Sequence, residues 1–231
     1  MKIDILTLFP EMFTNVFEES IIHRAKTQGK VEIRIINFRD YSKDPHHKVD
    51  DTPYGGGNGM VLCCQPIFDC IESIRTKDSK VILLTPDGTK YHQELAYDLS
   101  KERHLIILCG HYEGFDERIR SLADIELSIG DYVLTGGEYA SMVITDSIIR
   151  LLPGVIKEDS HLQESFNDHL LDYPDYTKPR VFRGMEVPEV LLSGDHQKIA
   201  EFRQNERVKR TKQRRPDIYI EECGDDALST K

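Results

Sequence analysis

Three glycine-rich segments hold the residues best suited to bind a ligand. They are Thr85-Pro86-Asp87-Gly88, Cys109-Gly110-His111-Tyr112-Glu113-Gly114 and Gly130-Asp131-Tyr132-Val133-Leu134-Thr135-Gly136-Gly137-Glu138. Such loops offer backbone amides and carbonyls at close range, but they contain no cluster of Lys or Arg to meet a phosphate. The pattern therefore favours a ligand with a flat purine and no phosphates. S-adenosylmethionine fits, because carboxylates such as Glu113 or Asp172 suit its positively charged sulfonium and amino groups.

A fourth glycine-rich segment, Tyr54-Gly55-Gly56-Gly57-Asn58-Gly59-Met60, fits neither common nucleotide-binding fingerprint. A P-loop needs Gly-Lys-Ser/Thr, and here Met60 follows Gly59; a GxGxxG motif that starts at Gly55 needs glycine where Met60 stands. A kinase or an NAD enzyme is therefore not indicated. Two interpretations remain: a flexible loop, or a backbone that must approach a flat group closely because glycine has no Cβ.

Cysteines and histidines form no recognisable metal or disulfide motif. The five cysteines, at positions 63, 64, 70, 109 and 223, are odd in number and contain no CxxC pair. Asp50 and Asp51 follow His46 and His47 closely and could suggest a metal site. Identical residues that are adjacent on a loop, however, rarely bind the same ion. We predict no protein-bound metal from these residues.

The elements that must position the glycine-rich segments alternate between strand and helix patterns. Strands are predicted at 2–9, 31–38, 81–84, 105–109 and 125–129, and helices at 11–26, 67–75, 93–101, 115–122 and 137–151. This alternation predicts an α/β fold with a mostly parallel sheet that helices cover on both faces. Ligands bind at the carboxyl ends of such strands, where three of the glycine-rich segments begin.

Polar, proline-punctuated sequence from Val155 to Lys178 separates this α/β region from the C-terminal part. A connection of that length is usually functional or interdomain. A helix is predicted from Asp195, its N-cap, through Arg207 and beyond. We predict a domain at 1–159, a linker at 160–175 and a small helical domain at 176–231 whose last residues form a frayed tail.

Charge is distributed unevenly along the chain. The formal net charge of −10, from 30 Lys and Arg against 40 Asp and Glu, argues at first against a nucleic-acid partner. Cations nevertheless gather near the C-terminus, and Arg180 and Arg183 could extend the cluster. Such a run is ordinarily a solvated surface, but phosphate contact is the functional alternative. The candidate RNA-binding residues are Arg203, Arg207, Arg210, Arg214 and Arg215.

The N-terminus does not resemble a signal sequence, and no apolar run approaches the ~20 residues of a membrane span. These patterns predict a cytoplasmic protein without a membrane partner.

Five strings resemble, in order, the bacterial tRNA (guanine-N1)-methyltransferase family, TrmD, of the SPOUT superfamily. The strings are VDDTPYGGG from Val49, CGHYEGFDER from Cys109, SIGDYVLTGGE from Ser128, YTKP from Tyr176 and GMEVP from Gly184. The similarity extends from about Met1 to Tyr219. It implies a SPOUT-type parallel sheet with a deep trefoil knot, spanning about residues 83–140, and a homodimer with its active site at the interface.

The resemblance also implies the reaction: S-adenosylmethionine-dependent methylation of N1 of guanosine 37 in tRNA, beside the anticodon, when another guanosine precedes it. A dependence on Mg²⁺ is implied too, although no motif locates an ion. The implied cofactor-binding residues are Leu84, Pro86, Gly88, Gly110, Tyr112, Glu113, Ile129, Gly130, Tyr132, Leu134, Gly136, Gly137 and Asp172. The family commonly has glutamine where Asp87 stands.

Base-assisted, in-line methyl transfer needs a carboxylate to take the N1 proton and a cation to stabilise charge on O6. By resemblance these are Glu164, where the family usually has aspartate, and Arg150. Asp168 and Asp172 compete with Glu164 for the role of base, and the helix dipole alone would favour a cation at Arg150. The candidate residues for binding the anticodon loop of the tRNA are Tyr54, Gly55, Gly57, Gly59 and Ser165. The hypothesis for residues 55–59 is that they close over the target base, with Tyr54 as a stacking surface.

Two other classes of protein remain as alternatives. One is a SPOUT-like protein that binds RNA or cofactor without catalysis, and the other is a metabolic α/β enzyme that acts on a small nucleotide.

Overall fold

A computed structural model describes residues 1–156 and 164–219 of the chain. The chain divides into two units, Met1–Glu158 and Asp159–Lys231, and each is considered by itself. Among the described residues, no helix is both long enough and apolar enough to cross a membrane.

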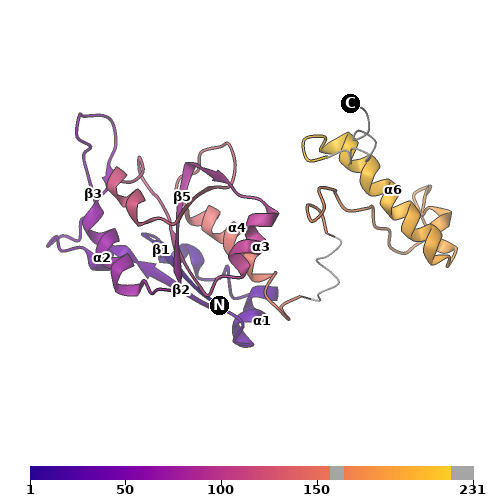
Figure 1. Ribbon diagram of the computed structural model, residues 1–231, viewed down its shortest axis with the longest axis horizontal. Helices are drawn as coiled ribbons and strands as arrows, with labels where there is room; N and C mark the ends of the chain where they lie inside the picture. The colour runs from indigo at the N-terminus through magenta and orange to yellow at the C-terminus, as the bar shows by residue number, and fades with distance from the viewer. Residues whose placement is uncertain (157–163, 220–231) are drawn as a thin grey trace, which may run out of the picture. The chain divides into compact units, whose positions relative to one another are not determined.

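The first unit is built on a parallel sheet of five strands, as the sequence predicts (Figure 1). The strands are β1 (Lys2–Thr7), β2 (Glu32–Asn37), β5 (Ser79–Lys90), β6 (His104–Leu108) and β7 (Ile125–Ser128). Their order across the sheet is β2-β1-β6-β5-β7, and every neighbouring pair is parallel. The central strand β6 is buried throughout, which explains its uninterrupted apolar sequence.

Helices cover both faces of this sheet. Helices α1 (Ser20–Thr27), α3 (Gln93–Ser100) and α4 (Glu138–Ile149) bury apolar side chains against Ile3, Ile5 and Ile107 on one face. Helix α2 (Cys64–Ile74) packs against the other face, where Leu6 and Ile106 point. Successive strand residues thus enter opposite cores, as the two-residue period of a strand requires. Figure 1 shows α2 and α4 on opposite sides of the sheet.

Two predicted helices are wrong in extent. The segment 11–26 forms a 3-10 helix, η1 (Pro10–Phe13), and then α1, which begins only at Ser20. Thr14 donates its hydroxyl to the Glu11 carbonyl, and such side-chain bonds compete with a continuing helix. The predicted helix at 115–122 is instead a 3-10 helix, η3 (Glu117–Leu122), and its N-cap Asp116 accepts a hydrogen bond from the Arg118 amide.

A buried carboxylate joins three neighbouring strands. Asp4 on β1 is fully buried and accepts hydrogen bonds of 2.7 and 2.6 Å from the Arg34 guanidinium on β2. His104 Nε2 on β6 lies 2.8 Å from the same carboxylate. Burial by itself would raise the pKa of Asp4, but the bonds from Arg34 and His104 hold it below its usual 3.8.

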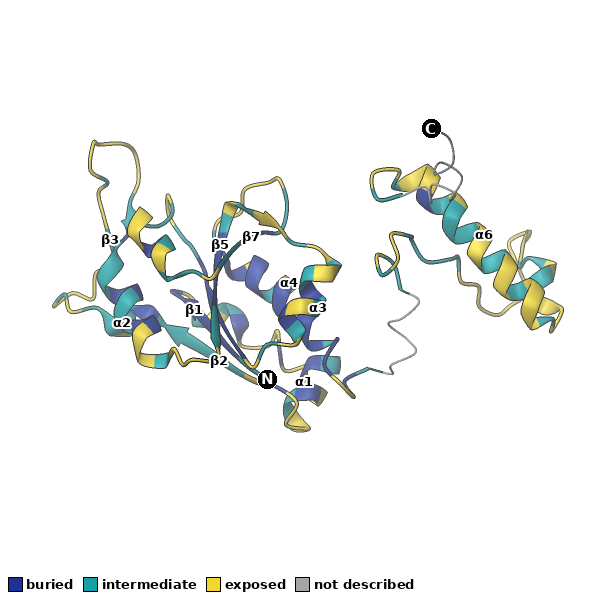
Figure 2. Ribbon diagram, viewed as in Figure 1, coloured by how far each residue is buried: buried dark blue, intermediate teal, exposed yellow. Residues whose placement is uncertain are grey.

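The second unit is dominated by α6 (His196–Arg214). Asp195 caps it, as predicted, by accepting a hydrogen bond of 3.2 Å from the Lys198 amide. A short hairpin of β8 (Val181–Phe182) and β9 (Met185–Glu186) and a 3-10 helix, η4 (Glu189–Leu192), precede it. Within residues 164–219, Thr211 is the only buried residue, and it is polar. Figure 2 shows α6 mostly in the colours of intermediate and exposed residues. This unit therefore depends on polar contacts more than on an apolar core.

Candidate cofactor pocket and catalytic residues

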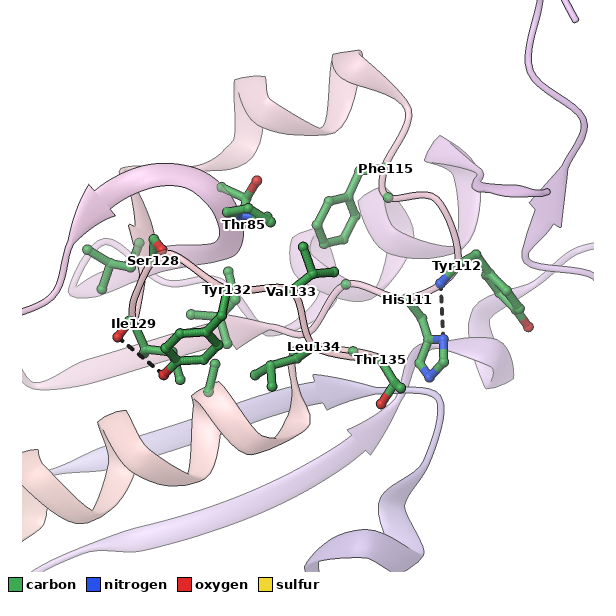
Figure 3. Close-up of a pocket in the computed structure, with 18 of the residues that line it drawn as sticks. Thr85, His111, Tyr112, Phe115, Ser128, Ile129, Tyr132, Val133, Leu134 and Thr135 are labelled. Carbon is green, nitrogen blue, oxygen red and sulfur yellow. Dashed lines mark hydrogen bonds between the residues drawn. The ribbon is translucent and has the colours of Figure 1, made fainter. Parts of the chain in front are cut away.

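A cavity of about 370 Å³ lies at the carboxyl ends of β6 and β7 and beside β5 (Figure 3). A volume of this size suits a small ligand. Three of the glycine-rich segments meet here. Two of them follow the carboxyl ends of β6 and β7, which share one edge of the sheet. The predicted strand end at residue 84 is wrong, because β5 continues to Lys90 and Thr85-Pro86-Asp87-Gly88 lies within it. The cavity is lined by these residues that the resemblance implied: Leu84, Pro86, Gly110, Tyr112, Glu113, Ile129, Gly130, Tyr132, Leu134, Gly136 and Gly137.

Gly88 does not line the cavity. A Cβ at Gly88 would lie 2.5 Å from the Leu127 backbone nitrogen, so this glycine permits the close approach of β5 to β7. The pairing of these two strands shifts register between Leu84 and Thr89. The residues between them bulge out of the ladder, which leaves Thr85 and Pro86 in the cavity wall.

Two of the loops touch through their backbones. The Gly137 amide donates a hydrogen bond of 2.8 Å to the Gly110 carbonyl, and His111 forms a bridge with Gly136. A Cβ at Gly137 would lie 2.8 Å from the Cα of Cys109, and backbone atoms there cannot move aside. Glycine is therefore required for the two loops to form one wall of the cavity.

A buried glutamate anchors this wall to the sheet. Glu138, the first residue of α4, is almost fully buried and accepts a hydrogen bond of 2.7 Å from the Thr7 hydroxyl at the end of β1. The carboxylate also stands at the positive end of the helix dipole. Burial, with Glu138 nearby, raises the pKa of the adjacent Cys109 thiol, so Cys109 acts as an apolar side chain.

Arg120 lines the cavity without being available to a phosphate. Its guanidinium lies 2.8 Å from Asp87 and 3.1 Å from Glu117, and it also pairs with Glu126. Burial acts to lower the pKa of Arg120, but these carboxylates raise it overall. A hydrogen bond from Thr85, with the nearby Arg120, lowers the pKa of Asp87. Asp87 thus pairs with Thr85 and Arg120 of the cavity wall instead of facing a ligand.

The glycine-rich loop at 54–59 connects the short strands β3 (Asp50–Asp51) and β4 (Val61–Leu62) and reaches the cavity at one end. The Glu113 amide donates to the Met60 carbonyl at 3.0 Å, and a Cβ at Gly59 would lie 2.5 Å from Glu113 Cγ. Tyr54, Gly55 and Gly57 lie in the exposed part of the loop, and the glycines there adopt positive φ. The structure thus brings Gly59 against Glu113 of the cavity wall, although Gly59 itself does not line the cavity, and it leaves Tyr54 in solvent.

Arg150 caps the far end of α4. Since a helix rises about 1.5 Å per residue, Arg150 lies roughly 20 Å along the axis from Gly137 at the cavity. The side chains of Tyr139 and Val143 are about half exposed and share a helix face with Arg150. The structure does not bring Arg150 to the cavity of its own chain.

The remaining predicted site residues belong to the second unit. Ser165 accepts a hydrogen bond of 2.9 Å from the Asp172 amide, and Glu164 is half-buried. Arg203 and Arg207 make contacts inside the unit, to Tyr173 and Asp168 respectively. Arg215 pairs with Asp217, and Arg214 is exposed while Arg210 is half-buried.

Metal ligands do not gather in the part of the chain that is described. Neither 1–156 nor 164–219 contains a group of three or more His, Cys, Asp or Glu side chains that could hold an ion.

A family model described as tRNA (Guanine-1)-methyltransferase TrmD matches residues 1–221. The chain belongs to the TrmD family. Relatives named tRNA (guanine-N(1)-)-methyltransferase occur in Bacillus cereus (strain AH820) and Bacillus anthracis (strain A0248). Each is 56% identical over 227 residues, which cover 96% of this chain and 93% of the relative. The resemblance inferred from the five strings is confirmed.

Several cavity residues of this TrmD chain were missed in the sequence. They are Thr85, His111, Gly114, Phe115, Arg120, Leu127, Ser128, Val133, Thr135 and Ala140. Most lie inside the quoted strings, close to predicted residues, so assigning whole strings to the pocket would have found them. Arg120 is different, because its position depends on how η3 folds back towards β5 and β7. Glu138 was also missed, although a carboxylate directly after Gly136-Gly137 was a visible signal.

Proposed function

We propose that the protein transfers a methyl group from S-adenosylmethionine to N1 of guanosine 37 in tRNA when a guanosine precedes it. The observation that carries the proposal is the glycine-lined cavity at the carboxyl ends of parallel strands, in a chain of the TrmD family. The relatives' names specify guanine N1 of tRNA.

The chemistry of the cavity supports S-adenosylmethionine as its occupant. Leu84, Ile129 and Leu134 supply apolar surface for a flat ring, and the glycines bring backbone amides and carbonyls within reach of it. Glu113 supplies a carboxylate for the cofactor's positive charge. The carboxylates around Arg120 cancel the cation that would otherwise attract a phosphate.

Two residues outside the cavity have catalytic roles in this proposal. Glu164 accepts the N1 proton of guanine, which makes N1 nucleophilic as the methyl group arrives in line from the sulfonium. Arg150 stabilises the negative charge that develops on O6. The bound cofactor supplies the methyl group and the positively charged sulfur that leaves with the bonding electrons.

The position of Arg150 supports a homodimer. Since Arg150 and the cavity lie at opposite ends of α4, a site that uses both is completed by a second copy of the chain. The exposed side chains Tyr139 and Val143 on α4, with Val133 in the adjacent loop, form an apolar surface for that contact. We propose that about residues 83–140 form the trefoil knot, supported by the Gly110–Gly137 backbone contact.

The second unit is proposed to hold the anticodon stem-loop, with Arg210 and Arg214 as phosphate contacts. The loop at 54–59 is proposed to close over the target base, and the protein to act in the cytoplasm. Mg²⁺ has no ligand set in residues 1–156 or 164–219, and no step is assigned to it.

Transfer of labelled methyl groups from S-adenosylmethionine to tRNA transcripts tests this function. Transcripts with guanosine at positions 36 and 37 should be labelled, and the same transcripts with either guanosine replaced should not. Binding of cofactor and tRNA without any labelling would instead support the non-catalytic alternative.

A further inference from the structure

The cations of α6 form two neighbouring stripes with different environments. Arg203, Arg207 and Thr211 recur every four residues and so lie on one face of the helix. Arg210 and Arg214 form the adjacent stripe, and the structure pairs neither with a carboxylate in residues 164–219. The first stripe instead contacts residues 168–173.

Arg207 binds Asp168 through both of its terminal nitrogens. Nη1 lies 2.9 Å from Oδ2 and Nη2 lies 2.6 Å from Oδ1, a two-pronged geometry that fixes orientation as well as distance. The Arg207 side chain is only 11% exposed. A phosphate could reach this guanidinium only by displacing Asp168.

The other members of the stripe hold the same segment. The buried Thr211 hydroxyl accepts a hydrogen bond of 2.8 Å from the Leu171 amide and donates one of 2.7 Å to the Arg207 carbonyl. The Arg203 guanidinium lies over the Tyr173 ring, 4.5 Å from its centroid.

The segment held in this way forms a strained turn. Phe166 and His169 have φ of 76° and 61°, values that side chains with a Cβ rarely adopt. The Phe166 amide donates to the Leu170 carbonyl at 2.9 Å, and the Asp172 amide donates to the Ser165 hydroxyl at 2.9 Å. Such a turn persists when its surroundings determine it, and here α6 provides them.

We infer that Arg207 and Thr211 are positioning residues that hold the turn 165–172 on α6 and thereby place Glu164. The inference rests on the proposed function, in which Glu164 is the base and directly precedes this turn. It changes the role expected of Arg207 from tRNA contact to internal support. RNA contact then depends on the stripe of Arg210 and Arg214.

Hydrogen exchange of the full-length protein, without cofactor or tRNA, tests the support itself. Arg207→Gln and Thr211→Val should each accelerate exchange of the 165–173 amides, Leu171 above all, by several-fold or more. Arg210→Gln removes the same charge from the neighbouring stripe and should leave that exchange unchanged. Unchanged exchange in both Arg207→Gln and Thr211→Val would overturn the inference.

Single-turnover methylation at saturating tRNA tests the consequence for catalysis. Arg207→Gln should lower the rate by about tenfold or more, as expected when a catalytic group is displaced, with an unchanged salt slope of tRNA binding. Asp168→Asn should have a similar effect, and the double variant should be no worse than either single variant because both changes break one contact. Arg207→Lys should be intermediate, since it keeps the charge but loses the two-pronged bond.

Two results would contradict the catalytic consequence. A salt slope reduced by about 0.9 in Arg207→Gln, with a normal rate at saturation, would make Arg207 a phosphate contact. A large loss in Asp168→Asn alone, with Arg207→Gln normal, would make Asp168 the base. Absence of methylation by the unaltered protein would refute the proposed function, while the exchange result would still decide whether the turn is held.

Discussion

At the residue scale, carboxylates offset the positive charge of Arg120, the arginine that lines the cavity. Asp87, Glu117 and Glu126 surround the Arg120 guanidinium, and Glu113 stands in the cavity wall beyond them. The Arg120 side chain is 29% exposed, and the three carboxylates within reach of it offset its charge. This arrangement favours a ligand that carries positive charge, which is the property by which S-adenosylmethionine differs from nucleotides.

Replacement of Glu164 by Gln tests the proposed base. Gln keeps the size of the side chain but cannot take a proton, so the single-turnover methylation rate should fall by about a hundredfold or more. Affinities for tRNA and S-adenosylmethionine should change little. Asp175→Asn removes an exposed carboxylate elsewhere in the linker and serves as the control. A near-normal rate for Glu164→Gln would exclude this residue as the base.

At the element scale, the sheet is held together by charge as well as by apolar packing. The Asp4 carboxylate ties β1 to β2 and β6. Because its pKa is lowered by folding, its contribution to stability is complete above its unfolded pKa and is lost as pH falls through its folded value.

Asp4→Asn should therefore destabilise the fold in a pH-dependent manner. Removing one partner of a buried ion pair should lower the free energy of unfolding by about 3 kcal/mol at neutral pH. The difference in unfolding free energy between Asp4→Asn and the unaltered protein should persist down to about pH 4 and become smaller at lower pH. Urea unfolding at a series of pH values measures this, with the exposed Asp78→Asn as control. A difference that stays constant well below pH 3 would contradict the explanation.

The helix α6 should lose RNA affinity when its outer cations are removed. Replacing Arg210 and Arg214 together by Gln should weaken tRNA binding and flatten its salt dependence, by about 0.9 for each phosphate that is no longer neutralised. Cofactor affinity should be unchanged, because these residues lie outside the cavity-lining set. Filter binding at several salt concentrations measures the tRNA affinity and its salt slope, and calorimetry measures the cofactor affinity. Unchanged tRNA affinity would show that the RNA is held elsewhere.

These elements also show what a sequence can and cannot predict. The parallel sheet was predictable because its strands are continuous apolar runs with helices between them. The break before α1 was not, since it depends on the Thr14 hydroxyl and on Ser20 at a φ of 56°. The spacing of Arg203, Arg207 and Thr211 was visible, but their partners lie some 30 to 40 residues away, and nothing local connects them.

At the scale of the whole molecule, the chain separates a cavity-bearing unit from a cation-bearing one. This explains how a protein with a net charge of −10 is compatible with an RNA substrate, because the relevant charge is local. The position of the cavity at the strand ends was predictable from the glycine-rich segments, which also favoured a purine ligand without phosphates, such as S-adenosylmethionine. The resemblance to TrmD added the individual cofactor-binding residues and the reaction.

Mixing two inactive variants tests whether the active site is shared between subunits. Gly137→Val should block the cavity, because its Cβ has no room beside Cys109, and Arg150→Gln should remove the proposed catalytic cation. If the two variants are mixed in equal amounts and exchange subunits freely, half of the dimers contain one subunit of each kind. Each of these dimers has one intact site out of two, so about a quarter of full activity should return. No recovery, after subunit exchange has been verified, would place Arg150 with the cavity of its own chain.

The backbone contact between Gly110 and Gly137 also bears on inhibitor design. A compound that hydrogen-bonds to main-chain groups of this wall contacts atoms that every amino acid possesses, so substitutions have little means of removing those contacts. The glycines themselves cannot be exchanged without collision. Escape from such a compound should therefore arise at peripheral side chains such as Tyr132 and Leu134, and resistance screening can concentrate on those positions.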